Sequence, residues 1–133
     1  MIHQDHALTE LAILSAASVL VEDEAYDIAE AELQWALSHE PRAEIADLVR
    51  LRLGQVLFQK NQLDKALEII TLSIGRERGY QDSLLELQGD IYLMQDKPKK
   101  ALSSYEAALS ANDVISSHQA LQWKIDDLAG VTQ

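Results

Sequence analysis

The strongest constraint on the fold of this chain is a set of small residues that recurs at a fixed interval. Gly54 and Gly89 are 35 residues apart, and Ala66 and Ala101 are separated by the same interval. Apolar residues at helical spacing follow each of these glycines and alanines. A repeat of this length is typical of a unit of helix, tight turn and helix that stacks on copies of itself.

The small residues have a packing reason. Two antiparallel helices approach closely only where one presents small residues to large residues of the other. A glycine inside a helix costs about 1 kcal/mol relative to alanine, so its reuse at one place in the repeat indicates a close helix contact. We expect Gly54 and Gly89 to admit the second helix of each unit. The larger residues Leu33, Ile70 and Tyr105 are then expected to fill the gap to the next unit.

A third and weaker copy of the repeat precedes the two clear ones. Its matching positions are Ala17, Leu20, Ala29, Leu33 and Ala36, with Pro41 at its end. We therefore predict one domain over residues 1–133, with repeats at about 10–43, 47–80 and 82–115. The expected helices lie near residues 7–21, 25–38, 42–60, 63–75, 80–95, 98–110 and 115–128, the last without a partner helix.

Local signals support these boundaries. Asn61 followed by Asp64 resembles a capping box. Asp96 is expected to cap the helix that follows it, with Pro98 tolerated in the first turn. Gly79 stands where a helix is expected to end.

Composition agrees with helices and limits the possible partners. Aromatic residues make up 5% of the chain, and it has five glycines and two prolines, which favours helices over a sandwich or barrel. There is no cysteine, so disulfides and thiolate chemistry are excluded. The formal net charge is −11, and residues 1–47 hold eleven carboxylates against Arg42 alone. This argues against nucleic acid and anionic membrane surfaces, and leaves a docking face for a basic partner or a solvated helix surface.

The repeat units resemble the tetratricopeptide repeat. Its consensus has a large residue, Leu-Gly and Tyr, followed by Ala, an aromatic residue, Ala and Pro. The best match, residues 82–115, has Gly89, Tyr92, Ala101, Tyr105 and Ala108. The spacing drifts from 34 residues, and the consensus tryptophan of the first helix is absent. The resemblance implies an all-α fold, a right-handed superhelix of three helix pairs plus a C-terminal helix at about 115–128.

The order of motifs narrows this resemblance to the periplasmic domain of the YfgM family, over about residues 7–128. The motifs that carry it are Leu51-Arg52-Leu53, Leu87-Gln88-Gly89-Asp90, Ala101, Tyr105-Glu106 and Lys124-Ile125-Asp126-Asp127-Leu128. Family members are single-span inner-membrane proteins of Gram-negative bacteria, ancillary subunits of the Sec translocon. Their periplasmic repeats associate with PpiD, a membrane-anchored chaperone. Met1 is then expected to begin a shortened form that lacks the anchor.

The resemblance implies a non-catalytic protein-interaction module at the periplasmic side of the inner membrane, aiding the handling of secreted proteins. Its expected partners are subunits of the SecYEG translocon and the periplasmic chaperone PpiD, with membrane contact through the missing anchor alone. Self-association stays open. The alternative is a tetratricopeptide scaffold in the cytosol or on a lipoprotein that binds a different partner.

The first helices of stacked pairs line the concave side of such a fold, which predicts a partner-binding groove. The repeat phase places nine residues there: Leu14, Val21, Leu51, Gln55, Phe58, Glu86, Asp90, Leu93 and Met94. An exposed apolar set of this kind usually marks an interaction site. Glu86 and Asp90 would repel an acidic peptide tail, so a carboxylate clamp is not expected. The alternatives are a groove covered by the C-terminal helix with Leu121, Trp123, Ile125 and Leu128, a shifted repeat phase, or a self-association surface.

No catalytic motif and no cofactor-binding motif occurs in the sequence, and an enzyme is not expected. His3, Asp5 and His6 have the spacing of a metal site, but a frayed terminus explains them better, so no metal is expected. Trp35 and Trp123 fall at helical spacing beside aliphatic residues and are expected to be packing anchors.

One basic cluster stands out, at Lys97, Lys99 and Lys100. It lies at a turn between two expected helices. The cluster is interpreted as a solvated turn or as a contact for acidic partners or phospholipid headgroups.

Overall fold

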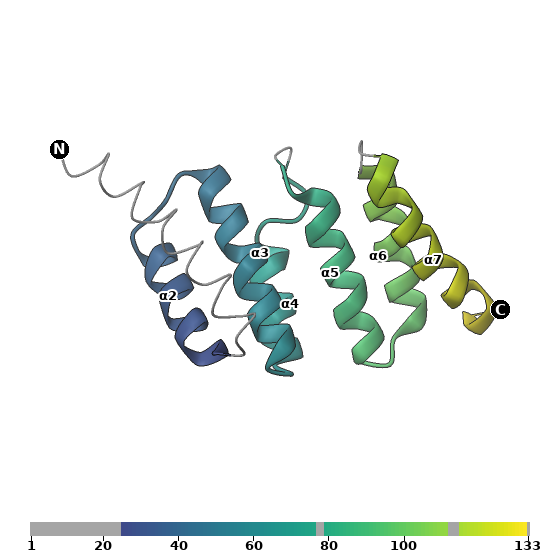
Figure 1. Ribbon diagram of the computed structural model, residues 1–133, viewed down its shortest axis with the longest axis horizontal. Helices are drawn as coiled ribbons and strands as arrows, with labels where there is room; N and C mark the ends of the chain where they lie inside the picture. The colour runs from purple at the N-terminus through teal and green to yellow at the C-terminus, as the bar shows by residue number, and fades with distance from the viewer. Residues whose placement is uncertain (1–24, 77–78, 112–114, 133) are drawn as a thin grey trace. The chain divides into compact units, whose positions relative to one another are not determined.

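The computed structural model describes residues 25–76, 79–111 and 115–132, which form six α-helices and no strand (Figure 1). The all-α prediction is confirmed. The expected helix at 7–21, with the groove residues Leu14 and Val21, lies outside the described residues. Within them, no helix has both the length and the hydrophobicity to cross a membrane. The helices are α2 (Tyr26–Ser38), α3 (Ala43–Gln59), α4 (Leu63–Thr71), α5 (Gln81–Met94), α6 (Pro98–Ala111) and α7 (Ile115–Thr132).

The chain divides into two compact units, residues 1–69 and 70–133, and the boundary falls within α4. In the first unit α2 packs against α3. Lys60, just after α3, joins the two helices through Asp27 and Glu30 of α2, with Nζ–O distances of 2.6 Å to each. The buried apolar residues are Ala29, Leu33 and Ala36 of α2 and Val49, Leu53, Val56 and Leu57 of α3.

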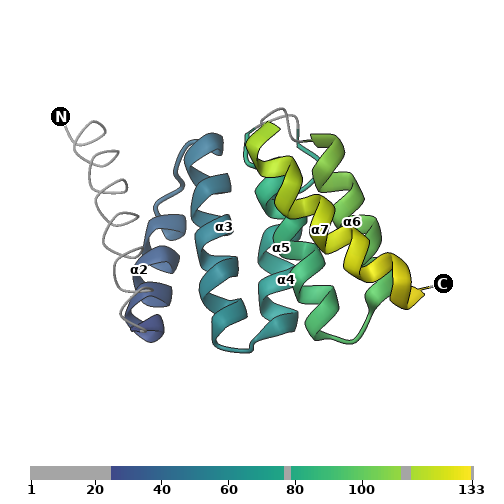
Figure 2. The same ribbon diagram turned by 45° about the vertical axis from the view of Figure 1, so that its right-hand side comes forward.

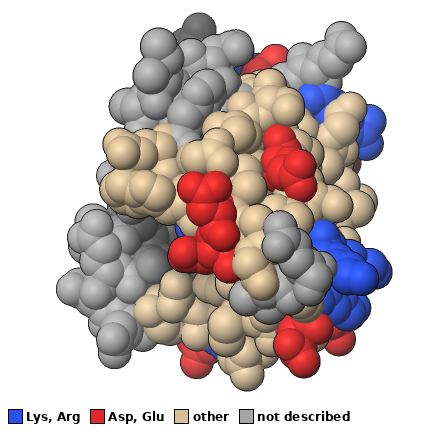
Figure 3. All heavy atoms as spheres, turned by 90° about the vertical axis from the view of Figure 1, so that its right-hand side faces the viewer, with Lys and Arg blue, Asp and Glu red and all other residues tan. Residues whose placement is uncertain are grey.

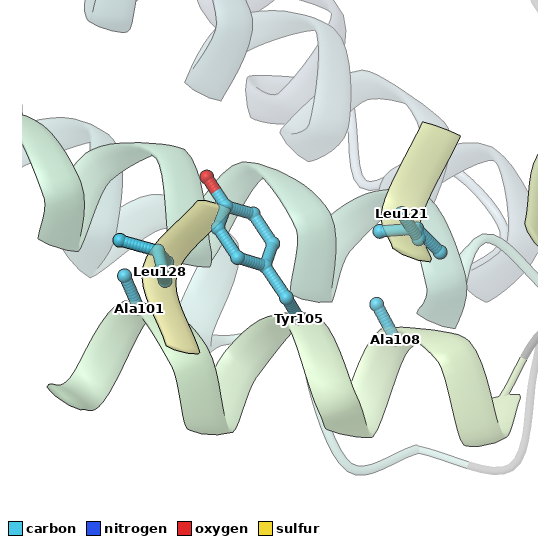
Figure 4. Close-up of a cluster of buried hydrophobic side chains, with 5 residues drawn as sticks. All are labelled: Ala101, Tyr105, Ala108, Leu121 and Leu128. Atoms are coloured by element: carbon cyan, nitrogen blue, oxygen red, sulfur yellow. The ribbon is translucent and has the colours of Figure 1, made fainter. Parts of the chain in front are cut away.

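In the second unit α5 packs against α6, and α6 packs against α7 (Figure 2). A cluster of buried side chains joins α6 to α7. In this cluster Leu128 lies near Ala101 and Leu121 lies near Ala108, so the two helices run antiparallel (Figure 4). Tyr105 occupies the space between these two pairs, as expected for the residue that fills the gap to the next helix.

Gly89 is a point of close approach between α5 and α6. A β-carbon added at this glycine would lie 2.6 Å from Cδ1 and 2.9 Å from Cζ of Tyr105. Real β-carbons do not approach other atoms so closely, and the obstacle is an aromatic ring that is itself buried. The predicted need for a glycine at this position is confirmed. It comes from the contact between α5 and the Tyr105 ring of its partner helix α6.

The turns after α3 and α5 share one geometry, which differs from the predicted caps. Asn61 and Asp96 have left-handed backbone conformations, with φ of 60° and 61°. In each turn the next residue, Gln62 or Lys97, donates its backbone N–H to the carbonyl five residues back. This is a Schellman motif, which ends the preceding helix. Asn61 and Asp96 therefore are not the N-cap residues of α4 and α6. The N-cap position of each helix is the next residue in the chain, Gln62 or Lys97.

The connection from α4 to α5 begins earlier than expected. Helix α4 ends at Thr71 and not near 75, and Gly75 takes a φ of 87° that favours glycine. Gln81 stabilises this turn: its amide nitrogen donates to the carbonyl of Ser73 at 2.8 Å, and its amide oxygen accepts from the N–H of Gly75 at 2.9 Å. The predicted helix end at Gly79 is therefore wrong, because Gly75 provides the left-handed residue.

Candidate protein-interaction site

An ion network holds α7 against α5. Lys124 of α7 places its Nζ 2.6 Å from a carboxylate oxygen of Glu86 and 3.1 Å from one of Asp90. The hydroxyl of Tyr105 donates a hydrogen bond to the same Oδ1 of Asp90. The Lys124 Nζ also lies 5.4 Å from the centroid of the Tyr105 ring, within cation–π range. One lysine thus satisfies two carboxylates that would otherwise repel each other.

The pKa values of this network show which groups carry charge. Burial raises the pKa of the Tyr105 hydroxyl, and its hydrogen bond to Asp90 raises it further. Burial lowers the pKa of Lys124, but its hydrogen bond to Glu86 and the charge of Asp90 outweigh that effect, so the net shift is upward. Tyr105 is therefore neutral and Lys124 positive at physiological pH.

The two acidic residues of the predicted groove are thus in contact with α7. Glu86 and Asp90 are half-buried and bind Lys124. The C-terminal helix thus contacts the acidic part of the predicted groove, while its buried Leu121 and Leu128 pack against α6 and its Trp123 is exposed. A partner does not meet these carboxylates unless it competes with Lys124.

Two groove residues of the second unit remain accessible. Leu93 is 44% exposed and Met94 is 60% exposed, at the C-terminal end of α5. They form a small apolar surface that nothing in the described part of the second unit covers. We define Leu93 and Met94 as the α5 apolar edge.

The first unit holds the other three described groove residues. Gln55 and Phe58 are half-buried on α3, and the Gln55 amide oxygen accepts a hydrogen bond from Arg52 at 3.2 Å. Leu51 is 4% exposed and offers little surface to a partner. Because the nine residues are divided between two units, a single groove formed by all of them stays a prediction.

The prediction that both tryptophans are packing anchors is wrong. Trp123 is 61% exposed and Trp35 is 41% exposed. The aliphatic neighbours of Trp123 at Leu121 and Ile125 are two residues away, and residues two apart do not share a helix face. Trp35 contacts the ring of His39, with a centroid distance of 3.9 Å.

Charge on the visible face of the second unit is mixed. In Figure 3, acidic side chains lie among uncharged residues, and Lys and Arg side chains gather along one edge. Among the described residues no three His, Asp or Glu side chains come together as a metal site. The candidates His3, Asp5 and His6 lie outside the described residues.

These features define a helical repeat module with a small exposed apolar edge. The family model for the tetratricopeptide repeat-like domain matches residues 2–130. The chain therefore belongs to the tetratricopeptide repeat-like domain family.

Curated relatives narrow the similarity further. The chain is 36% identical over 118 residues to the ancillary SecYEG translocon subunit of Neisseria gonorrhoeae, covering 88% of this chain and 56% of the relative. It is 31% identical to the protein of the same name from Aggregatibacter actinomycetemcomitans, covering 89% and 56%, and 28% identical to that of Escherichia coli strain K12, covering 90% and 57%. The predicted similarity to the YfgM family is confirmed. The chain spans a little over half the length of these relatives.

A solved structure supports the fold. The tetratricopeptide repeat domain of P58(IPK) superposes with a TM-score of 0.76 and 20% sequence identity, covering 99% of this chain and 37% of that one. At this identity the similarity concerns the fold alone.

Sequence reasoning missed the network of Lys124, Glu86, Asp90 and Tyr105. The bond from Tyr105 to Asp90 spans 15 residues, and the bonds from Lys124 span 34 and 38. The interval of 34 residues equals the consensus repeat length, but periodicity alone does not say which side chains of two helices form an ion pair. A charged residue within the apolar pattern of the last helix was the available signal.

Proposed function

We propose that this chain is a non-catalytic protein-interaction module of a protein that associates with the SecYEG translocon. The observation that carries the proposal is the common name of the curated relatives. Those that align with about nine-tenths of this chain are named ancillary SecYEG translocon subunit. On the family resemblance, the module acts at the periplasmic side of the inner membrane. There it works with the chaperone PpiD in handling secreted proteins.

The α5 apolar edge is the surface we propose for partner contact. Leu93 and Met94 lie on the first helix of the α5–α6 pair, the position that faces partners in many stacked repeats. Leucine and methionine adapt to varied apolar segments, which suits a module that meets more than one protein. The neighbouring carboxylates bind Lys124, so apolar contact is the main interaction that this edge offers.

Site-specific photo-crosslinking in cells tests the proposal in the full-length protein. Photoreactive residues replace Leu93, Met94 and, in the first unit, Phe58. Glu106, exposed on α6, serves as the control position. We expect crosslinks to translocon subunits and to a membrane-anchored periplasmic chaperone from Leu93 and Met94, and none from Glu106.

Other outcomes contradict the proposal in distinct ways. Capture of a second copy of the same protein alone would make the α5 apolar edge a self-association surface. Capture of a cytosolic assembly partner would favour the scaffold alternative. Equal crosslinking from Glu106 would show that the contacts do not depend on this edge.

A further inference from the structure

Three exposed lysines lie where α5 connects to α6: Lys97 in the connection and Lys99 and Lys100 in the first turn of α6; we define them as the lysine turn. Two other lysines of the chain, Lys60 and Lys124, each contact two carboxylates. Within the described ranges the three lysines make no ion pair. Lys100 makes a cation–π contact, with its Nζ 5.7 Å from the ring centroid of Tyr92. The charges of the lysine turn are therefore available to a ligand.

Two neighbouring surface hollows lie at the lysine turn. One has a volume of about 410 Å³ and is lined by Tyr92, Lys99, Lys100, Ser103 and Ser104. The other, of about 390 Å³, is lined by residues 97–100, so the two share Lys99 and Lys100. Ammonium and hydroxyl groups are donors that bind phosphate oxygens, and Ser103 is exposed beside the lysines.

The α5 apolar edge directly precedes the lysine turn in the chain. Leu93 and Met94 are exposed, and Lys97 follows Met94 by three residues. Clusters of exposed lysines attract anionic headgroups, so the lysine turn offers a membrane contact that follows, in the sequence, the edge we assign to protein partners.

Helix stability does not explain the lysines. The first turn of α6 contains Lys99 and Lys100 and no acidic residue. Positive charge at the N-terminus of a helix interacts unfavourably with the helix dipole. Carboxylates would be favourable at this position. The placement is thus unfavourable for α6 by itself.

We propose that the lysine turn docks on anionic phospholipid headgroups and leaves the α5 apolar edge to protein partners. The inference rests on the proposed function, because a membrane-anchored parent would hold the turn near a bilayer. The chain's charge of −11 does not prevent this, since physiological salt screens charges beyond about 8 Å. An acidic protein segment is the competing ligand, and the proposed membrane-anchored parent, which would hold the turn near a bilayer, favours the headgroup.

Vesicle flotation tests the proposal with the chain itself. Neutral phosphatidylcholine vesicles are compared with vesicles that also contain phosphatidylglycerol. Lys97→Gln, Lys99→Gln and Lys100→Gln are combined in one variant. The matched control combines Arg42→Gln, Lys65→Gln and Arg76→Gln, which removes the same charge from three other exposed positions.

We expect binding to the anionic vesicles alone, weakened about 10- to 100-fold in the lysine-turn variant and little changed in the control. Leu93→Ser with Met94→Ser should leave vesicle binding little changed, because the α5 apolar edge is assigned to protein partners. Equal loss in both charge variants would overturn the proposal, because it would reveal a general effect of net charge.

Two competition experiments distinguish a lipid headgroup from free phosphate and from an acidic protein segment as the ligand of the lysine turn. Inorganic phosphate and a polyglutamate peptide are each titrated against vesicle-bound protein. Displacement by phosphate at low concentration would show a free-phosphate site, and displacement by polyglutamate alone would show a site for acidic protein; either result overturns membrane docking. The vesicles contain no translocon, so failure here leaves the crosslinking result of the proposed function intact.

Discussion

Gly89 shows how one residue decides a helix contact. Its missing β-carbon leaves room for the ring of Tyr105, which is buried between α5, α6 and α7. Tyr105 also donates its hydroxyl to Asp90 on the same helix as Gly89. The close approach therefore serves both the apolar packing and the polar network.

Gly89→Ala should lower the free energy of unfolding by about 1–3 kcal/mol, because the added methyl group collides with the Tyr105 ring. Helix propensity alone predicts the opposite, a gain of about 1 kcal/mol. Urea unfolding followed by circular dichroism measures the difference. The matched control is Gly130→Ala on α7, where an added β-carbon meets nothing within 4 Å. A Gly89→Ala variant as stable as Gly130→Ala would contradict the close approach.

Helix α7 is held by two kinds of contact. Leu121 and Leu128 pack in the buried cluster with α6, and Lys124 reaches the carboxylates of Glu86 and Asp90 on α5. The apolar contacts position the helix along α6, and the ion network ties it to α5. Its attachment should therefore depend on the protonation of the network.

Alkaline pH should weaken the second unit. The folded-state pKa values of Tyr105 and Lys124 are both raised above their ordinary values of 10.0 and 10.5. A group with a raised pKa stabilises the fold fully below its unfolded-state pKa and loses this contribution as pH rises. We expect the free energy of unfolding to fall above about pH 10.

Tyr105→Phe isolates the tyrosine in this pH profile. The variant should be less stable at neutral pH by about 1–3 kcal/mol, because a hydrogen bond to a carboxylate is lost. Its decline above about pH 10 should be shallower by up to about 1.4 kcal/mol per pH unit. Tyr80→Phe, at an exposed tyrosine, is the control. Identical alkaline slopes for Tyr105→Phe and the parent chain would refute the assignment.

At the scale of the molecule, each compact unit has its own buried residues. In repeat folds stability is approximately a sum of terms from each repeat and its neighbours. A substitution in the core of one unit should then lower the stability of that unit more than the stability of the other.

Leu121→Ala should lower stability by about 2–5 kcal/mol, because it removes a buried leucine from the cluster between α6 and α7. Hydrogen exchange followed by mass spectrometry should show faster exchange in α6 and α7 by at least about tenfold. Helices α2 and α3 should change much less. Trp123→Ala, at an exposed position on the same helix, should change stability by less than about 0.5 kcal/mol. Equal acceleration in both units would show that they unfold together.

Much of the fold could be predicted from periodicity. The interval between Gly54 and Gly89 indicated the repeat, and the apolar stripe of Ala29, Leu33 and Ala36 is buried as the repeat requires. The candidate site was harder to predict. Leu93 and Met94 on α5 are exposed, but Leu51 on α3 is buried, and the repeat phase, which placed all three in the groove, did not distinguish them.

The sequence by itself determined the helices, their repeat and the need for glycine at position 89. These features depend on local conformational preferences and on intervals along the chain, which the order of residues states directly. The tertiary structure alone decided that Lys124 meets Glu86 and Asp90, that Trp123 is exposed, and that the lysine turn has no carboxylate partner among the residues the structure describes. Such pairings depend on which surfaces of different helices come within a few ångströms, and intervals along the chain do not specify those distances.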